Sequence, residues 1–414
     1  MSLSRHASAA ELQKRANMLN RIKTAYMKWY KIQPPVDDPT FTTFDTVVDT
    51  FYKYANKLRD AKATYAAEPL EPRARSESEI SLIIPVGTDF RARQRFIGND
   101  GRLRIGRLLE VVDLVAPCCL YKLNRADMTS TSFEDGTLPR MFVTSRFHPT
   151  NLSWNGDYQL QDLLMTAKVT WTSEFRAETT VAVQARHGEM FSARLVFTSL
   201  DGRDTSKKLP MNQLKPKTPW ERVHHKQRDE VNTARPPLPD VESIEIPIIK
   251  EGQVSVSSTR ALCELVAQPE HENPYGSVFG GFLIRKGLET AELCARKFAG
   301  DDVKIVSLME AEFIRVVELG GILSFESYVC NVNNNTKQIQ VVTIANVYNP
   351  ETKKFEMCDR FCFNFEFNKN SALPEVVPQT VQEFISQWKV KQMRQKDKDS
   401  RREVFVSGSA TVIK

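Results

Sequence analysis

Residues 271–285 of the 414-residue chain read HENPYGSVFGGFLIR, and this stretch decides the fold prediction. A polar loop containing proline and glycine runs into Gly280 and Gly281, which open an apolar segment predicted to be helical over 279–298. Glycine lets another group approach the backbone closely. The first amides of a helix have no acceptor inside it and lie at the positive end of its dipole. The stretch therefore predicts a helix start suited to a developing oxyanion.

A matching stretch lies in the first half of the chain, where residues 101–113 read GRLRIGRLLEVVD. Aligning Gly106 with Gly281 sets the two halves 175 residues apart. At this offset Asp113 falls opposite Leu288, and Asn273 falls opposite Gly98. Each half keeps one polar group that the other lacks, which is typical of a fused pair that retains one composite site.

Asp113 is the most unusual of these residues, because it lies in a segment that is apolar on nearly all sides and is predicted to be a buried helix over 103–124. Burying an unpaired carboxylate costs on the order of several kcal/mol. We interpret Asp113 as a base or nucleophile whose surroundings tune its pKa. A carboxylate satisfied by neighbouring donors is the alternative.

The neighbouring polar residues have ordinary structural explanations as well. Asn273 precedes Pro-Tyr-Gly, which is common turn chemistry. We interpret His271 as a loop histidine, and Arg285 and Lys286 as charges on the helix surface that are able to meet a phosphate.

The order of elements repeats along the chain. Each half is predicted to have one strand, one long helix and then a series of antiparallel strands with alternating apolar residues. The predicted strands lie at 80–86, 141–147, 169–172, 181–185 and 191–197, and again at 244–249, 305–316, 323–329, 339–348 and 361–367. One helix buried on all sides must be covered by its sheet. The periodicity alone predicts an α+β fold.

Composition shifts divide the chain into five parts. An N-terminal arm, residues 1–75, is followed by a first domain over 76–205, a Lys- and Pro-rich linker over 206–240, a second domain over 241–370 and a helical, charged tail over 371–414. In the arm a helix is expected over 46–66. The first thirty residues are basic and rich in Ala, Ser and Leu, which indicates a mitochondrial presequence; an ordinary basic helix and a cytoplasmic location are the alternative.

Composition also excludes several classes of protein. The net charge of +6 is mild and is not concentrated with aromatic residues, so a nucleic-acid partner is not expected. The seven cysteines form no short pairs, and no set of ligands completes a metal site. No apolar run is long enough for a membrane-spanning helix. No metal or redox cofactor is expected.

The two stretches together resemble the tandem-hotdog acyl-CoA thioesterases, and they look closest to the mitochondrial acyl-coenzyme A thioesterase 9 class. Three segments carry the resemblance, which covers roughly residues 76–370: Asn273 to Gly276, Phe279 to Arg285, and Arg104 to Asp113. It implies two tandem hotdog domains, each an antiparallel sheet wrapped around one long central helix. The implied reaction is hydrolysis of fatty acyl-CoA to fatty acid and coenzyme A.

The resemblance also implies roles for particular residues. Asp113 and Asn273 match the family's catalytic positions, and the amide that polarises the thioester carbonyl is carried over to Gly281, with Gly280 as the alternative. Arg102 and Arg104 are expected near the phosphates of coenzyme A, and the chains are expected to form homo-oligomers such as a trimer. One departure is Pro117, which is expected to kink or end the helix that carries Asp113.

Two other enzyme classes are disfavoured. None of the six histidines follows an aspartate by five residues, as the enoyl-CoA hydratase pattern requires, and no G-x-S-x-G elbow of a serine hydrolase occurs. A non-catalytic acyl-CoA sensor or an assembly subunit with the same fold is the alternative function.

Overall fold

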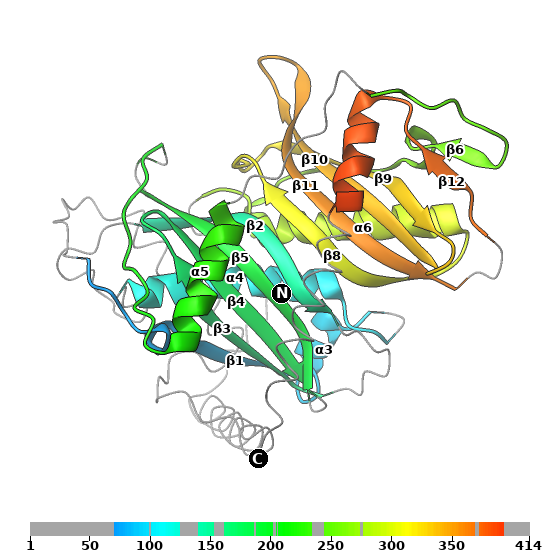
Figure 1. Ribbon diagram of the computed structural model, residues 1–414. Helices are drawn as coiled ribbons and strands as arrows, with labels where there is room; N and C mark the ends of the chain where they lie inside the picture. Colours follow the sequence, from blue (N-terminus) through cyan, green and yellow to red (C-terminus); the bar gives the residue numbers. More distant parts are fainter. Residues whose placement is uncertain are drawn as a thin grey trace, which may run out of the picture. The chain divides into compact units, whose positions relative to one another are not determined.

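The computed structural model describes residues 70–98, 101–124, 140–152, 161–185, 188–201, 204, 206–233, 244–273, 276–368 and 372–392. The chain divides into two compact units. The first consists of Met1–Val143, Ser153–Ala193 and Phe197–His225, and the second of Thr144–Leu152, Arg194–Val196 and Lys226–Lys414. Helices and antiparallel sheet occur in both, so the predicted α+β class is confirmed (Figure 1).

The first sheet has the strand order β1-β3-β4-β5-β2. Its strands are β1 (Ile80–Ile84), β2 (Arg140–Leu152), β3 (Leu163–Thr172), β4 (Arg176–Ala185) and β5 (Gly188–Asp201). Two helices precede β2, the short α3 (Phe90–Phe96) and the long α4 (Ile105–Leu123). Helix α4 packs against β1, β3 and β4, and nearly all of its residues are buried, as their apolar character predicts.

The sequence predicts a kink or an end of the helix at Pro117. Helix α4 instead continues past Pro117 to Leu123. Proline cannot donate to the carbonyl four residues earlier, which here belongs to Asp113. The residues on both sides of Pro117 are fully buried. Packing against the sheet therefore outweighs the local preference of proline and carries the helix through.

The second sheet has the order β7-β9-β10-β11-β8. Its strands are β7 (Ala261–Val266), β8 (Val303–Phe313), β9 (Ile322–Asn333), β10 (Gln338–Asn349) and β11 (Lys354–Phe367). The long helix α6 (Gly280–Ala299) packs against all five strands and ends at Gly300, whose φ is 65°. A positive φ favours glycine, so the helix ends where the sequence supplies one.

The strand orders of the two halves share one pattern. In each half, the strand before the long helix stands at one end of the order, and the first strand after the helix stands at the other end. The N-cap residues of the two helices, Arg104 and Phe279, are separated by the same 175 residues as Gly106 and Gly281. The repeat that the sequence analysis predicts in element order is therefore present in strand order as well.

Several segments differ from the prediction, which includes neither α3 nor β7, the strand that precedes α6. The strand predicted over 244–249 is wrong, because residues 244–250 form no regular structure and Ile246, Ile248 and Ile249 are exposed. Pro247 interrupts this stretch and lacks the amide that a ladder needs. The linker contains helix α5 (Pro219–Thr233), which the sequence analysis does not predict.

A capping box explains the start of α5. The carboxylate of Glu221 accepts hydrogen bonds from the amides of Lys217 and Thr218 at 2.6 and 3.1 Å, and the Thr218 hydroxyl accepts one from the Glu221 amide at 3.1 Å. Pro219 occupies the first helical position, where its missing amide costs nothing. The sequence Thr-Pro-Trp-Glu at 218–221 is the signal for this helix start.

The C-terminal segment begins with strand β12 (Glu375–Val377), which pairs in parallel with β6 (Gln253–Ser255). The sequence pattern predicts a helix over 377–393, and the observed helix covers 381–392, since Val377 lies in β12. Val390 packs with Cys330, Val342 and Cys362 of the second sheet. The helix expected over 46–66 and the basic N-terminal thirty residues lie outside the described residues.

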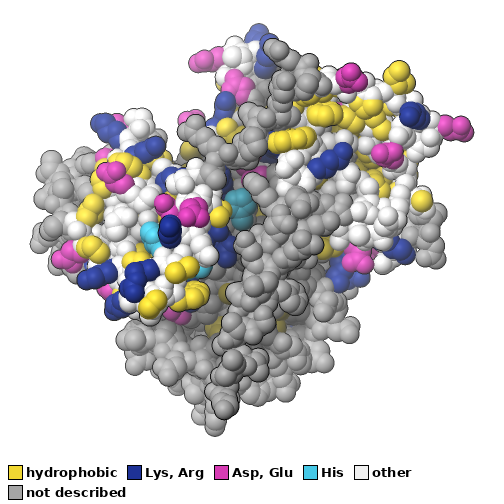
Figure 2. All heavy atoms as spheres, in the orientation of Figure 1, with side chains coloured by type: hydrophobic (Ala, Val, Ile, Leu, Met, Phe, Trp, Pro, Cys, Tyr) yellow, Lys and Arg dark blue, Asp and Glu magenta, His cyan; other side chains and the backbone are white. Residues whose placement is uncertain are grey.

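The surface agrees with the mild net charge. On the face seen in Figure 2, the Lys and Arg side chains of the described residues lie among Asp and Glu and do not gather into one patch. Among the described helices, none is long and apolar enough to cross a membrane.

Candidate functional site

The start of helix α6 has the geometry that the diglycine predicts. Phe279 is the N-cap, with φ −72° and ψ 129°, and no side chain caps it. Its carbonyl accepts hydrogen bonds from the amides of Phe282 and Leu283 at 3.1 and 3.3 Å. The amides of Gly280 and Gly281 precede these first bonds, so the helix itself offers them no acceptor. Amides without an acceptor at a helix start are able to stabilise an oxyanion.

The loop before α6 is closed by Asn273. The Asn273 amide donates to the Ser277 carbonyl at 2.6 Å, and its side-chain oxygen accepts from the Ser277 amide at 3.1 Å. Its Nδ2 donates to the Val278 carbonyl at 3.4 Å. Gly276 has a φ of 85°, which a residue with a side chain rarely adopts. Asn273 thus has the structural role of a turn residue, and it holds the backbone that leads into the helix start.

An aromatic stack joins this loop to the helix. The rings of His271 and Phe282 lie 3.8 Å apart at an interplanar angle of 18°. The guanidinium of Arg285 lies over the same Phe282 ring, 5.3 Å from its centroid. His271 Nδ1 also accepts a hydrogen bond from the Gln268 amide at 3.1 Å. Stacking of this kind fixes the loop against the first turns of α6.

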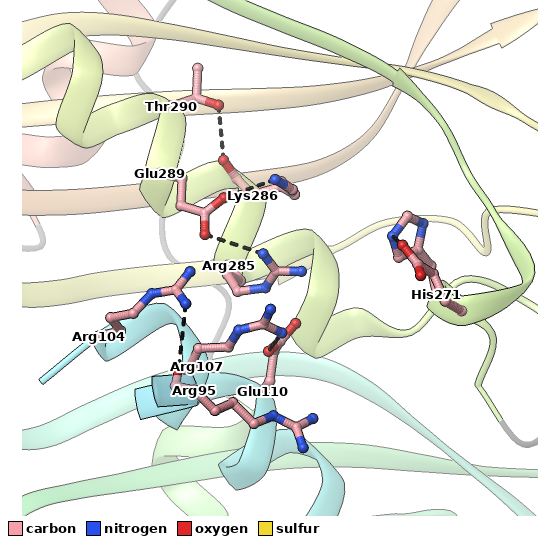
Figure 3. Close-up of polar contacts among 10 residues, drawn as sticks. Arg95, Arg104, Arg107, Glu110, His271, Arg285, Lys286, Glu289 and Thr290 are labelled. Atoms are coloured by element: carbon pink, nitrogen blue, oxygen red, sulfur yellow. Dashed lines mark hydrogen bonds and ion pairs between the residues drawn. The ribbon is translucent and has the colours of Figure 1, made fainter. Parts of the chain in front are cut away.

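Arg285 is buried, so its interpretation as a surface charge is wrong. Glu289 accepts hydrogen bonds from Arg285 at 3.2 Å and from Lys286 at 2.9 Å (Figure 3). Burial alone would raise the pKa of Glu289, but hydrogen bonds and charges from Lys286 and Arg285 outweigh it, and the pKa lies below its ordinary value. The three residues form a local ion-pair network on the helix.

Helix α4 begins in the same way as α6. The carbonyl of its N-cap, Arg104, accepts from the amides of Arg107 and Leu108 at 3.0 and 3.3 Å. Asp113 is the ninth residue of α4 and is only 4% exposed, so its predicted burial is confirmed. The ninth residue of α6 is Leu288, which is also buried. The carboxylate and the leucine occupy equivalent places in their helices.

The two candidate arginines before α4 belong to the connection between α3 and α4. The Arg104 amide donates to the Phe96 carbonyl at 2.7 Å, and its guanidinium donates to the Arg95 carbonyl at 3.3 Å (Figure 3). The carbonyl of Arg102 accepts from the Gly98 amide at 2.7 Å. Both side chains are half-buried. Gly98, which the offset sets opposite Asn273, thus lies in the loop before α4, as Asn273 lies in the loop before α6.

The candidate residues fall into two groups by unit. Asn273, Gly280 and Gly281 are held together at the start of α6 in the second unit. Asp113, Arg102 and Arg104 lie in the first. Within the described residues no group of three His, Cys, Asp or Glu is arranged to hold a metal.

Six of the seven cysteines are buried, and Cys263 is partly exposed. All seven are reduced, and burial raises the pKa of the Cys118, Cys294 and Cys330 thiols to about 12. A thiol of this kind is protonated at neutral pH and is inert.

A scan against models of known protein families finds no match for this chain. Curated relatives are found across most of its length. The chain is 25% identical over 373 residues to a mitochondrial acyl-coenzyme A thioesterase 4 of Humulus lupulus, covering 80% of this chain and 68% of that protein. It is 24% identical over 360 residues to the mitochondrial acyl-coenzyme A thioesterase 9 of Homo sapiens, covering 80% of each.

The chain is a homologue of acyl-coenzyme A thioesterases. The resemblance that the sequence stretches indicate is confirmed at this level. Solved structures are similar to this thioesterase homologue in part. An acyl-CoA hydrolase of Staphylococcus aureus in complex with butyryl coenzyme A is 21% identical, with a TM-score of 0.35, over 39% of this chain and 99% of that one. An acyl-ACP thioesterase of Bacteroides thetaiotaomicron is 15% identical, with a TM-score of 0.42, over 71% of this chain and 100% of that one.

Proposed function

We propose that the chain hydrolyses fatty acyl-CoA thioesters to free fatty acid and coenzyme A. The observation that carries this proposal is the pair of equivalent helix starts, 175 residues apart, of which one is followed by Asp113 and the other is preceded by Asn273. Curated relatives that span 80% of the chain carry the name acyl-coenzyme A thioesterase.

The proposed site is composite. Each half supplies what the other lacks, since Leu288 stands where α4 has Asp113 and Gly98 stands where the second half has Asn273. In this proposal the two halves are tandem hotdog domains over 76–205 and 241–370, and the two helix starts face one site. A sheet packed on one long helix in each unit supports this interpretation.

The chemistry follows from the residue types. As a general base, Asp113 removes a proton from water, and the water oxygen attacks the thioester carbonyl carbon. The C–S bond then breaks, and the thiolate of coenzyme A leaves and takes up a proton. In the nucleophilic route a carboxylate oxygen of Asp113 attacks instead, coenzyme A leaves, and water hydrolyses the resulting anhydride.

The remaining residues serve the same steps. The Gly281 amide, with that of Gly280, stabilises the oxyanion that forms on the carbonyl oxygen. Asn273 orients the water or the carbonyl while it keeps the loop before α6 closed. Arg102 and Arg104 meet the phosphates of coenzyme A.

Location and assembly are part of the proposal. Relatives with mitochondrial names support a mitochondrial location, with the matrix as the compartment and the cytoplasm as the alternative. We propose a homo-oligomer, a trimer of two-domain chains.

The experiment measures release of free thiol from acyl-CoA esters of increasing chain length. Wild-type chain is compared with Asp113→Ala and Asn273→Ala, and Glu292→Gln on the outer face of α6 is the control. We expect wild type and control to turn over, and each site variant to lose roughly a hundredfold or more in rate. A wild-type chain that binds the esters without releasing thiol would support the non-catalytic sensor instead.

A further inference from the structure

Asp359 on strand β11 is a buried carboxylate that the proposed mechanism does not use. The side chain is fully buried, and neither carboxylate oxygen has a hydrogen-bond partner among the described residues. The Ile314 amide and the Cys358 thiol lie close enough to act on Asp359, but each makes its hydrogen bond to a backbone carbonyl. The Ile314 amide donates to the Cys358 carbonyl at 2.9 Å, and the Cys358 thiol donates to the Ala345 carbonyl at 3.3 Å. A carboxylate left in this state is strongly disfavoured as an ion.

The side chain faces helix α6. Alternate residues of a strand share one face of its sheet, so Asp359 shares a face with Phe361. A Cβ placed on Gly287 of α6 would lie 2.5 Å from the Phe361 ring, so this is the face on which the helix packs. The Thr343 hydroxyl donates to the Gly287 carbonyl at 3.2 Å and confirms the close approach from the paired strand.

Strand β11 is antiparallel to β8, which turns back after α6, so β11 runs in the same direction as α6 and Asp359, which precedes Phe361, lies toward the start of the helix. Phe361 is level with Gly287, and Phe363 lies two residues further along the strand. The far end of α6 is fixed by Cys294, whose thiol donates to the Thr259 carbonyl at 3.2 Å. The Thr259 hydroxyl in turn accepts from the amide of Val329 at 2.9 Å.

The register of β9, β10 and β11 shows which end of α6 lies near Phe363. Val329 pairs with Val341, and Val341 pairs with Phe363. Phe363 therefore lies on the side of Cys294. Two strand residues span about 7 Å, and seven helix residues span about 10 Å. Asp359 lies about 7 Å from Phe361 along the strand, so it lies between the level of Gly287 and the first turn of α6.

The pairing of β11 with β8 also places Asp359 near the start of α6. Asp359 pairs with Phe313, the last residue of β8. Four residues later the Val317 carbonyl accepts a hydrogen bond from the Val278 amide at 2.8 Å. Val278 is two residues before Gly280, the first residue of the helix. The buried carboxyl group therefore lies on the inner face of the sheet at the end where α6 begins.

We propose that Asp359 is a further functional residue of the thioesterase site, active in its neutral form, whose ionisation places a negative charge beside the helix-start amides of Gly280 and Gly281. The inference rests on the proposed function. An oxyanion on these amides carries the same sign of charge as an ionised Asp359. In a buried, low-dielectric site the repulsion between them is large. The neutral acid leaves the positive end of the helix dipole free to stabilise the oxyanion.

The surroundings of Asp359 favour the neutral acid. Burial raises its pKa to about 7, and the nearby Cys358 thiol and Ile314 amide only partly offset this. Its strand partners, Phe313 and Ala345, carry no charge.

The charged groups nearby are paired with one another. Arg360, adjacent on β11, faces the other side of the sheet and lies 4.0 Å from Glu312. In the loop before α6, His271 lies 3.3 Å from Glu270. The first turn of α6, residues 280–284, contains no titratable side chain. No charged side chain of the described residues is therefore set to hold Asp359 ionised.

The test is the pH dependence of kcat/KM for thiol release between pH 5.5 and 9. We expect wild-type kcat/KM to fall above pH 7, approaching roughly tenfold per pH unit, as a single ionisation requires. Asp359→Asn keeps the shape and removes the charge, so its kcat/KM should stay within about twofold up to pH 9. Glu366→Gln, an exposed carboxylate on the same strand, is the matched control and should follow wild type.

Two further variants complete the design. Asp359→Glu restores an ionisable group and should restore the alkaline fall, and Asp359→Ser replaces Asp359→Asn if the latter does not fold. An active wild type whose alkaline fall persists in Asp359→Asn overturns this inference alone. A wild type that releases no thiol at any pH overturns the proposed function together with it.

Discussion

Gly287 of α6 and Phe361 of β11 are in contact so close that a Cβ on the glycine would lie 2.5 Å from the phenylalanine ring. The ring is fully buried and is held between Phe313 and Phe363. A glycine in the middle of a helix is unfavourable by roughly 1 kcal/mol relative to alanine. It is found here because only glycine lets the helix approach the aromatic face of the sheet.

Gly287→Ala should therefore destabilise the second unit although alanine is the better helix former. The added methyl group must displace a ring that has no room to move, and overpacking of this kind costs roughly 1–3 kcal/mol. We expect a lower midpoint in thermal unfolding followed by circular dichroism. Lys297→Ala, at an exposed position of the same helix, is the control and should leave the midpoint nearly unchanged. An unchanged or higher midpoint for Gly287→Ala would contradict the packing described above.

Asp359 gives the stability of the folded chain a specific pH dependence. The folded carboxyl group holds its proton up to about pH 7, whereas its ordinary pKa is 3.8. The stabilisation is complete below pH 4 and is lost as pH rises through 7, because the unfolded chain releases the proton first. Between pH 5 and 7 the loss is on the order of 3 kcal/mol, since one pKa unit corresponds to about 1.4 kcal/mol.

Asp359→Asn removes this dependence. The difference in unfolding free energy between variant and wild type, measured by urea denaturation, should shift in favour of the variant from pH 5 to 7 and then level off. A difference that stays constant from pH 5 to 8 would mean that Asp359 has an ordinary pKa in the folded chain. This measurement needs no substrate and is independent of the proposed activity.

The stack of His271, Phe282 and Arg285 predicts a local effect on the loop that carries Asn273. Phe282→Leu keeps an apolar side chain and removes both ring contacts, which are worth roughly 1–2 kcal/mol together. We expect faster amide hydrogen exchange over residues 271–279 with little change in β9 and β10. Leu293→Ala, an exposed position on α6, is the control. Equal exchange in the loop of the variant and of wild type would show that the stack does not hold it.

Much of the secondary structure could be predicted because its signals are local. The diglycine helix starts within one residue of its predicted place, and the predicted strands other than 244–249 overlap observed strands. The wrong secondary-structure predictions have two causes. Either a local sequence signal was left out of the prediction, or side-chain packing outweighed the local signal. The capping box from Thr218 to Glu221 belongs to the first kind. Pro117, which the surrounding core carries within α4, belongs to the second.

Some features of the candidate site could be predicted from the sequence, and others depend on packing. The burial of Asp113 follows from an all-round apolar helix, and it is observed. The burial of Arg285 could not be inferred, because its guanidinium packs on the Phe282 ring, and this ring also stacks on His271, eleven positions earlier in the loop. Asp359 carried one usable signal, since it continues the alternation of the four phenylalanines that follow it.

The sequence by itself determined the α+β class, the repeated order of elements and the two equivalent helix starts, because periodicity and glycine placement act over short distances along the chain. Tertiary structure alone decided the strand order, the approach of Phe361 to Gly287 and the place of Asp359 beside the start of α6. These depend on the register between strands that are far apart in sequence, and register is set by how all the side chains of a face pack together.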